Sequence, residues 1–325
     1  MTNRRVRDRS DFLRSAFLAA ALCSCGSVWS QPATPASEYR VGCDKVCLEQ
    51  FADRYLDAVA NRMPSRVPLA PDVRFTENGT ELAIGDALWA TTDSLGANQL
   101  VFTDPASGGI HLYAAIVENG QPSMLAARLK VKDRQITEIE TSVLRRNADD
   151  PAMAAFAVDR PIWSQPVPQN QRVSREALID IADAYFEGIT QARGDITPFD
   201  DRCVRFENGG QMTLAENGGA VQQMSCQAQF AAGMLIIVTS VSNRRYLVID
   251  EENQVASAIV TFDHRGTLDA VPFGNPNNAS PGGQFSRPFS FLIFESFKII
   301  DGKIRQVEAT VFSVPYKMHP GWPAD

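Results

Sequence analysis

Two segments of the chain share a helical pattern of apolar positions. Within residues 48–59 and again within 178–189, apolar side chains recur three or four positions apart, as in a helix that buries one face. The positions are Leu48, Phe51, Tyr55, Leu56 and Val59 in the first segment, and Leu178, Ile181, Tyr185, Phe186 and Ile189 in the second. The sequence therefore predicts two amphipathic helices.

A similar series of strands is expected after each helix. A proline-containing turn leads to a short strand that ends in Asn-Gly, and longer apolar or alternating strands follow, separated by Asn-Gly, Asp-Gly or Arg-Gly turns. A hairpin closes each series, at residues 125–144 and 291–312. Residues 147–172 contain several X-Pro turns and are expected to be a linker.

The two series are copies of each other. Three pairs of segments match in the same order: 51–79 with 181–209, 100–120 with 246–266, and 130–143 with 298–311. The offset grows from 130 to 146 and then to 168, so the second copy carries insertions of 16 and 22 residues. Three collinear matches indicate an internal duplication.

The repeat predicts an α+β protein with two tandem domains, each an N-terminal helix packed on a strongly curved antiparallel sheet. We expect the first domain at residues 42–146, the linker at 147–172, and the second domain at 173–325, with two insertions and a C-terminal tail. The alternating strands are expected to bury one face against the helix.

Residues 1–30 are expected to be a signal peptide, followed by an N-terminal linker at 31–41. A basic stretch precedes an apolar run that is too short to span a bilayer, and a small-x-small cleavage signal ends at Ser30. Twin-arginine export and a lipoprotein signal are alternatives. The mature protein is therefore expected to be periplasmic or secreted, with no membrane association after cleavage.

The composition is that of a globular protein, with 44% hydrophobic and 21% charged residues. The formal charge is −7, and removing residues 1–30, which carry five arginines and two aspartates, makes it −10. An acidic chain is a poor partner for nucleic acid or anionic lipid, so neither is expected as a partner.

Four cysteines remain after the signal peptide, an even number that suits an oxidising compartment. Cys43 and Cys47 are close enough to bridge locally, which leaves Cys203 with Cys226. A metal site is the alternative, but none of the three histidines is at ligand spacing from a cysteine, and no metal is expected. Glycine-rich nucleotide motifs and the common hydrolase motifs are also missing from the sequence, so we expect no cofactor.

Three stretches resemble the nuclear transport factor 2-like, or SnoaL-like, superfamily: residues 53–59, 72–79 and 133–143. The whole chain, from about residue 42 to 322, is similar to an exported tandem SnoaL-like family. Its marks are the Cys43-x-x-x-Cys47 start, the paired Glu-Asn-Gly segments and the closing Val314-Pro315-Tyr316…Gly321-Trp322. The resemblance implies two cone-shaped domains. It leaves function open, because this scaffold hosts isomerases, dehydratases, cyclases, lyases and binding modules.

Similarity to ketosteroid isomerase implies catalytic residues in the first copy, with Tyr55 donating to an oxyanion and Glu77 moving a proton. On one strand, His111 and Tyr113 share a face and are expected to join them if that face lines the cavity, an arrangement similar to scytalone dehydratase. The structural alternative is that Tyr55 fills the domain and Glu77 caps a turn.

Four further residues are expected to bind substrate: Asn78, Trp89, Tyr185 and Glu207. The second copy has Ser257 and Ile259 where the first has the histidine and tyrosine, so the first domain is expected to hold the active site and the second to support it.

The expected function is that of a cofactor-free lyase, isomerase or dehydratase. Its substrate would be a small apolar or aromatic molecule, such as a lignin-derived compound, in a cone pocket. A non-catalytic periplasmic small-molecule-binding or structural module is the alternative. Ionisable groups converging in an apolar pocket favour the enzyme, whereas a domain filled by its own side chains favours the module. The protein is expected to be a monomer with an internal pseudo-dimer, or a homodimer.

Overall fold

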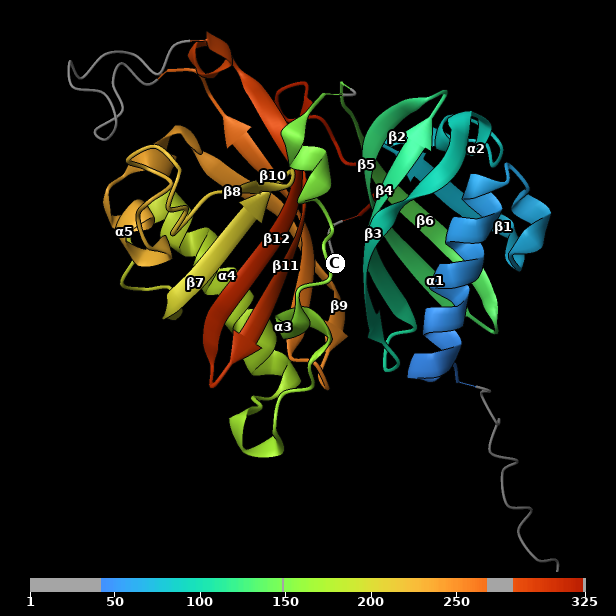
Figure 1. The fold of residues 1–325 in the computed structure, drawn as a ribbon, viewed down its shortest axis with the longest axis horizontal. Helices are drawn as coiled ribbons and strands as arrows, with labels where there is room; N and C mark the ends of the chain where they lie inside the picture. Colours follow the sequence, from blue (N-terminus) through green and yellow to red (C-terminus); the bar gives the residue numbers. More distant parts are fainter. Residues whose placement is uncertain (1–41, 148, 268–282, 324–325) are drawn as a thin grey trace, which may run out of the picture. The chain divides into compact units, whose positions relative to one another are not determined.

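The structure is a computed structural model that describes residues 42–147, 149–267 and 283–323 (Figure 1). It is an α+β fold with two six-stranded sheets, each packed with helices, which fits two tandem domains. The predicted signal peptide, the N-terminal linker and most of the second insertion lie outside the described residues. We refer to residues 42–146 as the first half and to residues 173–323 as the second half.

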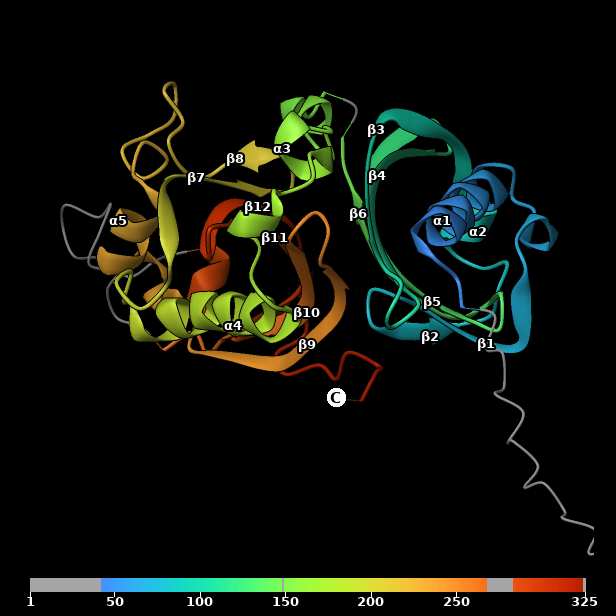
Figure 2. The ribbon, with the colours of Figure 1, turned by 90° about the horizontal axis from the view of Figure 1, so that it is seen from below.

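The first half contains two helices and one mixed sheet in the order β2-β1-β6-β5-β4-β3. The elements in chain order are α1 (Lys45–Ala60), β1 (Leu69–Glu77), β2 (Thr80–Leu82), α2 (Leu88–Thr91), β3 (Thr92–Asp104), β4 (Gly109–Glu118), β5 (Gln121–Lys132) and β6 (Gln135–Arg145). Figure 2 shows this sheet curving around α1 and α2.

The second half repeats this plan, with strand order β8-β7-β12-β11-β10-β9. Its elements are α4 (Arg175–Gln191), β7 (Phe199–Glu207), β8 (Gly210–Gln211), α5 (Cys226–Ala231), β9 (Ser240–Asp250), β10 (Val255–His264), β11 (Phe289–Ile300) and β12 (Lys303–Val314). The connecting segment 147–172 forms α3 (Pro161–Ser164) and two short 3-10 turns, Pro151–Ala154 and Gln169–Gln171. Identical strand orders agree with the duplication inferred from the sequence.

Neither sheet is purely antiparallel, which corrects the sequence-based expectation. The last strand of each half returns beside the first in the same direction, so that β1 pairs in parallel with β6, and β7 with β12. The other strand pairs are antiparallel, as expected. A parallel pair needs a long connection, which the intervening strands supply.

Each long helix begins at a side-chain cap and buries the predicted face. Asp44 accepts a hydrogen bond from the Cys47 amide at 2.9 Å, and Ser174 accepts one from Ala177 at 3.3 Å. The apolar side of α1 packs on the first sheet, and the apolar side of α4 packs on the second together with α5. Each helix thus covers one face of the sheet in its own half.

The repeated Asn-Gly turns are tied to the last strand of each half. The Asn78 side chain bonds both the amide and the carbonyl of Val143, at 2.9 and 3.2 Å, and Asn208 does the same with Val311, at 2.8 and 3.1 Å. Both asparagines have positive φ and precede a glycine that also does. This explains why Asn-Gly recurs at this point of each half.

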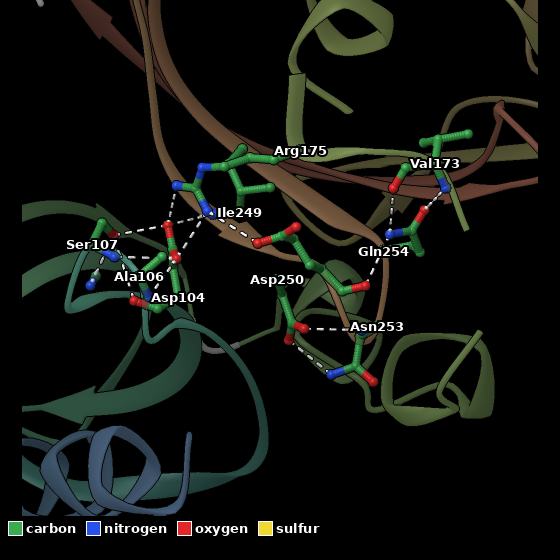
Figure 3. Close-up of polar contacts among 11 residues, drawn as sticks. Asp104, Ala106, Ser107, Val173, Arg175, Ile249, Asp250, Asn253 and Gln254 are labelled. Atoms are coloured by element: carbon green, nitrogen blue, oxygen red, sulfur yellow. Dashed lines mark hydrogen bonds and ion pairs between the residues drawn. The ribbon is translucent and has the colours of Figure 1, made fainter. Parts of the chain in front are cut away.

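The other faces of the two sheets pack against each other through a shared apolar core. The first half contributes Phe102 and Tyr113, the second Ile259 and Phe294, and the connecting segment Trp163. Beside this core the Asp104 carboxylate binds the Arg175 guanidinium, with an Nη1–Oδ1 distance of 3.0 Å, and the Ile249 amide at 3.2 Å (Figure 3). The halves are therefore joined by apolar and by ionic contacts.

The C-terminal tail folds back over the first half. The Trp322 indole donates to the Thr76 hydroxyl at 2.9 Å, and the Arg74 guanidinium lies 4.3 Å from the centre of the Trp322 ring. Arg74 also donates to the Gly321 carbonyl. The end of the chain thereby covers β1.

Both predicted disulfides, Cys43–Cys47 and Cys203–Cys226, are present. Such bonds persist in oxidising environments, in agreement with the expected location of the protein. In the part of the chain that is described, no helix is long and apolar enough to cross a bilayer.

Candidate functional site

A largely apolar pocket of about 190 Å³ lies in the second half, between α4 and α5 on one side and the sheet on the other. Its walls are mostly aliphatic and aromatic, which suits an apolar guest. Six ionisable or polar side chains reach it: Tyr185, Arg205, Glu207, Gln229, His264 and Glu295. The pocket therefore combines an apolar surface with a small number of groups that can form hydrogen bonds or exchange protons.

The Glu295 carboxyl, in the middle of β11, is the most unusual of these groups. The residue is 2% exposed, and Oε2 has no hydrogen-bond partner among the described residues. Burial raises the pKa of Glu295 to about 8, although the neighbouring Arg205 and the Tyr185 hydroxyl oppose the rise. This carboxyl is therefore mainly protonated at neutral pH and titrates close to it.

Tyr185 projects from α4 beside this carboxyl. Its ring is buried among Phe186, Phe230 and Phe297, and burial holds the pKa of its phenol well above the ordinary value. The phenol consequently stays protonated, and its hydroxyl lies next to both Glu295 and Arg205. A neutral phenol in such surroundings is a hydrogen-bond donor.

Arg205 is a buried cation with fixed neighbours. The guanidinium donates to Gln229 Oε1 at 2.8 Å and forms an ion pair with Glu207, while Gln229 is itself held by the Val221 carbonyl at 2.7 Å. Arg205 is 3% exposed, and although burial opposes its charge, the acidic groups around it, among them the paired Glu207 carboxylate, hold the pKa of the guanidinium above its ordinary value. This cation is thus permanently charged and oriented.

At the apolar end of the pocket, His264 is stacked on Phe289, with ring centres 4.3 Å apart and an angle of 5° between the planes. Burial lowers the pKa of His264 to about 4, so the imidazole is neutral at pH 7. The adjacent Asp263 carboxylate is bound by Ser240 and Ser290. His264 therefore acts here as an aromatic wall.

The equivalent region of the first half is packed differently. Tyr55 is completely buried, its ring meets Trp89 edge-on at 5.5 Å, and its hydroxyl has no hydrogen-bond partner among the described residues. Glu77 accepts from the Leu88 amide at 3.0 Å and pairs with Arg145 at 2.9 Å. Glu77 thus supports the start of α2.

The structure does not place His111 and Tyr113 in a cavity with Tyr55, because the face of β4 that they share is turned away from α1. Along β4, residues 110, 112 and 114 face α1, so the alternation of the strand turns His111 and Tyr113 toward the second sheet. The Tyr113 hydroxyl contacts the Phe294 carbonyl, Ser296 Oγ and the Glu308 carbonyl at 3.0–3.2 Å. Burial lowers the pKa of His111 to about 3, and neither ring nitrogen has a partner among the described residues.

Of the four residues predicted to bind substrate, two lie in each half. The Asn78 amide is occupied by Val143, and Trp89 lies in the first core, whereas Tyr185 and Glu207 line the second pocket. Within the described residues, no group of three or more His, Cys, Asp or Glu side chains is placed to hold a metal ion.

Sequence reasoning missed Arg205 and Glu295, although the repeat contains a signal for both. At the offsets of 130 and 168, they correspond to Phe75 and Ala127, which are apolar and buried in the first core. Two ionisable residues that replace two apolar residues at equivalent core positions must be compensated by hydrogen bonds or by other charges, and their place in a cavity indicates a functional site.

Comparison with known proteins gives limited information. Residues 171–311 match a family model described as "Domain of unknown function (DUF8021)", which covers most of the second half. No curated protein matches the chain. Fourteen solved chains match, among them "Crystal Structure of AclR a putative hydroxylase from Streptomyces galilaeus", with 14% identity over 42% of this chain and 90% of that chain and a TM-score of 0.27.

Proposed function

We propose that the second-half pocket is the active site of a cofactor-free enzyme that moves a proton on a small, largely apolar molecule. The class of reaction is isomerisation, elimination or dehydration. The supporting observation is the Glu295 carboxyl, buried beside the Tyr185 hydroxyl in an apolar cavity, with one oxygen free of hydrogen bonds among the described residues. A protonated carboxyl group and a phenol that lie side by side can both donate hydrogen bonds to a substrate oxygen that gains negative charge in the reaction.

In the proposed reaction, the substrate oxygen accepts hydrogen bonds from Tyr185 and from protonated Glu295. The Glu207 carboxylate, held by Arg205, takes a proton from the neighbouring carbon. Two electrons of the broken C–H bond then move toward the oxygen, where the two donors stabilise the charge. Return of the proton to a different carbon gives an isomer, and loss of a leaving group gives an elimination product.

The proposed active site thus lies in the second half, whereas the sequence analysis expected it in the first. The first half retains Tyr55 and Glu77, but apolar Phe75 and Ala127 stand where the second has Arg205 and Glu295. We also propose, from the motifs described above, that both halves are SnoaL-like cones and that the chain is exported after removal of a signal peptide.

The test is deuterium exchange into small cyclic ketones, 3-cyclohexenone and 1-tetralone, followed by NMR in D₂O. Exchange catalysed by the protein is expected to fall by about 10²–10³ in Tyr185→Phe and in Glu295→Gln. Tyr55→Phe and Glu216→Gln are matched controls, because the first lies in the other half and the second is exposed, and both are expected to retain exchange.

The competing function is a binding module that uses the same pocket. Thermal shift with the same ketones separates the two, because any ligand of the folded state raises Tm. A rise in Tm without exchange, unchanged in Glu295→Gln, would favour the module. Absence of both effects with every ketone would contradict this substrate class.

A further inference from the structure

A second hollow, of about 340 Å³, lies where the two halves meet; we refer to it as the junction groove. One side is formed by β5, β6 and Ser107 of the first half, and the other by Arg245–Leu247 of β9 and by Arg175 at the start of α4. Trp322 and Pro323 of the tail complete it. The volume is at the lower end of the range for small-molecule sites.

Cations outnumber carboxylates in the lining of the junction groove. It contains Arg128, Lys130, Arg175 and Arg245, but a single carboxylate, Glu138. Such a concentration of positive charge is unusual in a chain with a formal charge of −7. Cations from both halves converge there, so the groove exists only in the assembled tandem.

Two of the four cations are held by carboxylates behind the lining. Arg245 makes a two-pronged contact with Glu140, at 2.6 and 3.0 Å, and Arg175 is bound to Asp104 (Figure 3). These pairs fix the direction of the Arg175 and Arg245 guanidinium groups. An oriented cationic surface binds an anion at a lower entropic cost than flexible side chains do.

The other two cations have donors to spare. Arg128 is 6% exposed, donates to Glu138 through Nη1, and has a buried Nε without a partner among the described residues. The Lys130 ammonium, two positions along the same strand, makes no hydrogen bond or ion pair within that part of the chain, whereas the Lys130 carbonyl accepts from the Thr137 hydroxyl at 3.3 Å. A buried N–H without an acceptor is costly, and a ligand oxygen would satisfy it.

We infer that the junction groove binds a small oxyanion, the carboxylate or phosphate group of a small organic acid. Its oxygens would accept from Lys130 and from the free donors of Arg128, with Trp322 beside them, 5.7 Å from the Arg128 guanidinium. Glu138 competes with the ligand for Arg128. This site is separate from the second-half pocket, and it does not depend on the proposed reaction.

Isothermal titration calorimetry at low ionic strength tests this inference with succinate and inorganic phosphate, and with succinamide as an uncharged control. Saturable binding of at least one anion is expected, and the stronger of the two identifies the group. Lys130→Gln is expected to weaken binding about tenfold, the loss of one charge-assisted hydrogen bond. Lys132→Gln, which removes the same charge two positions along the strand from a residue outside the groove, is expected to leave it unchanged.

Glu138→Gln gives a result of opposite sign. It removes the competing carboxylate, so anion binding is expected to become tighter, a gain that misfolding cannot imitate. The inference is overturned if neither anion binds saturably, if succinamide binds as well as succinate, or if Lys130→Gln and Lys132→Gln weaken binding equally. Weaker binding in Glu138→Gln would also overturn it.

Discussion

Tyr113 and Tyr55 are both completely buried, yet their hydroxyl groups have opposite surroundings. The Tyr113 hydroxyl contacts three oxygens of the second half, whereas the Tyr55 hydroxyl has no hydrogen-bond partner among the described residues. A buried hydroxyl that is bonded stabilises the folded state, and one that is not bonded costs free energy. The same chemical change at the two positions should therefore have different effects.

Tyr113→Phe is expected to lower the free energy of unfolding by about 1–3 kcal/mol, because it removes the hydrogen bonds of a completely buried hydroxyl. Tyr55→Phe is expected to be neutral or stabilising, since it removes an unsatisfied polar atom. Urea denaturation of both variants measures the difference. Equal losses in the two variants would contradict the hydrogen-bond assignment.

Glu295 makes stability depend on pH. Burial raises the pKa of this carboxyl from 4.5 to about 8. Between these two pH values the unfolded chain has lost the proton that the folded chain retains. The destabilising contribution of Glu295 to the free energy of unfolding is therefore absent below pH 4.5, grows as the pH rises and is complete above pH 8. The expected slope is at most about 1.4 kcal/mol per pH unit for this one proton.

Glu295→Gln is expected to remove this dependence. Urea denaturation at several values between pH 5 and 8 should show that the variant gains stability relative to the natural protein as the pH rises. Taking the difference cancels contributions from His111 and His264, which are common to both proteins. Glu216→Gln, at an exposed position, should show no relative gain.

Among the elements, α5 is attached to the pocket by a covalent bond. The Cys203–Cys226 disulfide joins β7 to the start of α5, and one turn later Gln229 binds the Arg205 guanidinium. The Cys43–Cys47 disulfide lies at the start of α1, in the other half. Of the two disulfides, Cys203–Cys226 is therefore the one that supports the proposed site.

Replacing Cys203 and Cys226 by alanine is expected to lower stability by about 3 kcal/mol, given their separation of 23 residues, and to reduce exchange of the test ketones because Gln229 loses its position. The matched change at Cys43 and Cys47 is expected to cost about 2 kcal/mol, for a separation of four, with exchange retained. Unfolding curves and exchange rates for both double variants decide this. Equal loss of exchange in both would show that the effect is not local.

The order of elements was predictable because periodicity is a local property. Apolar spacing along residues 48–59 and 178–189 identified the helices, and Asn-Gly or Asp-Gly turns delimited the strands. The parallel pairing of β1 with β6 was not predicted, because it joins segments about 65 residues apart whose patterns do not specify a direction. Likewise, alternation placed His111 and Tyr113 together but did not decide which face of the sheet they occupy.

For the candidate site, the sequence identified Tyr185 and Glu207 but assigned them a supporting role. The familiar catalytic residue types occur in the first half, and the catalytic residues were therefore predicted there. Glu295 was not predicted, because it lies within an otherwise apolar strand. Whether a cavity is open or filled depends on the summed volumes of side chains from several elements. That sum is a property of the packed structure and is not visible in any single motif.

At the scale of the whole molecule, the two halves share a core. Phe102 and Tyr113 pack with Ile259, Phe294 and Trp163, and the buried Arg245–Glu140 pair lies beside them. Separating the halves would expose this apolar surface to water and break the ion pair. The halves are therefore expected to unfold together.

Scanning calorimetry of the mature chain is expected to show one transition, with equal calorimetric and van't Hoff enthalpies. Weakening the shared core by Phe294→Ala should lower the single Tm without splitting it, because both sheets lose the same contacts. Two resolved transitions in the natural protein would show that the core is not shared in solution.

The contact between Trp322 and Thr76 has a consequence for the order of biosynthesis. These residues are 246 positions apart, and Arg74 reaches the Gly321 carbonyl across a similar interval. Until Trp322, 246 positions after Thr76, has been synthesised, β1 lacks the cover that the tail provides, so this part of the first half is completed only after the second half has been made. A contact of such high sequence separation forms late in folding. The first strand to be synthesised is thus among the last to be finished.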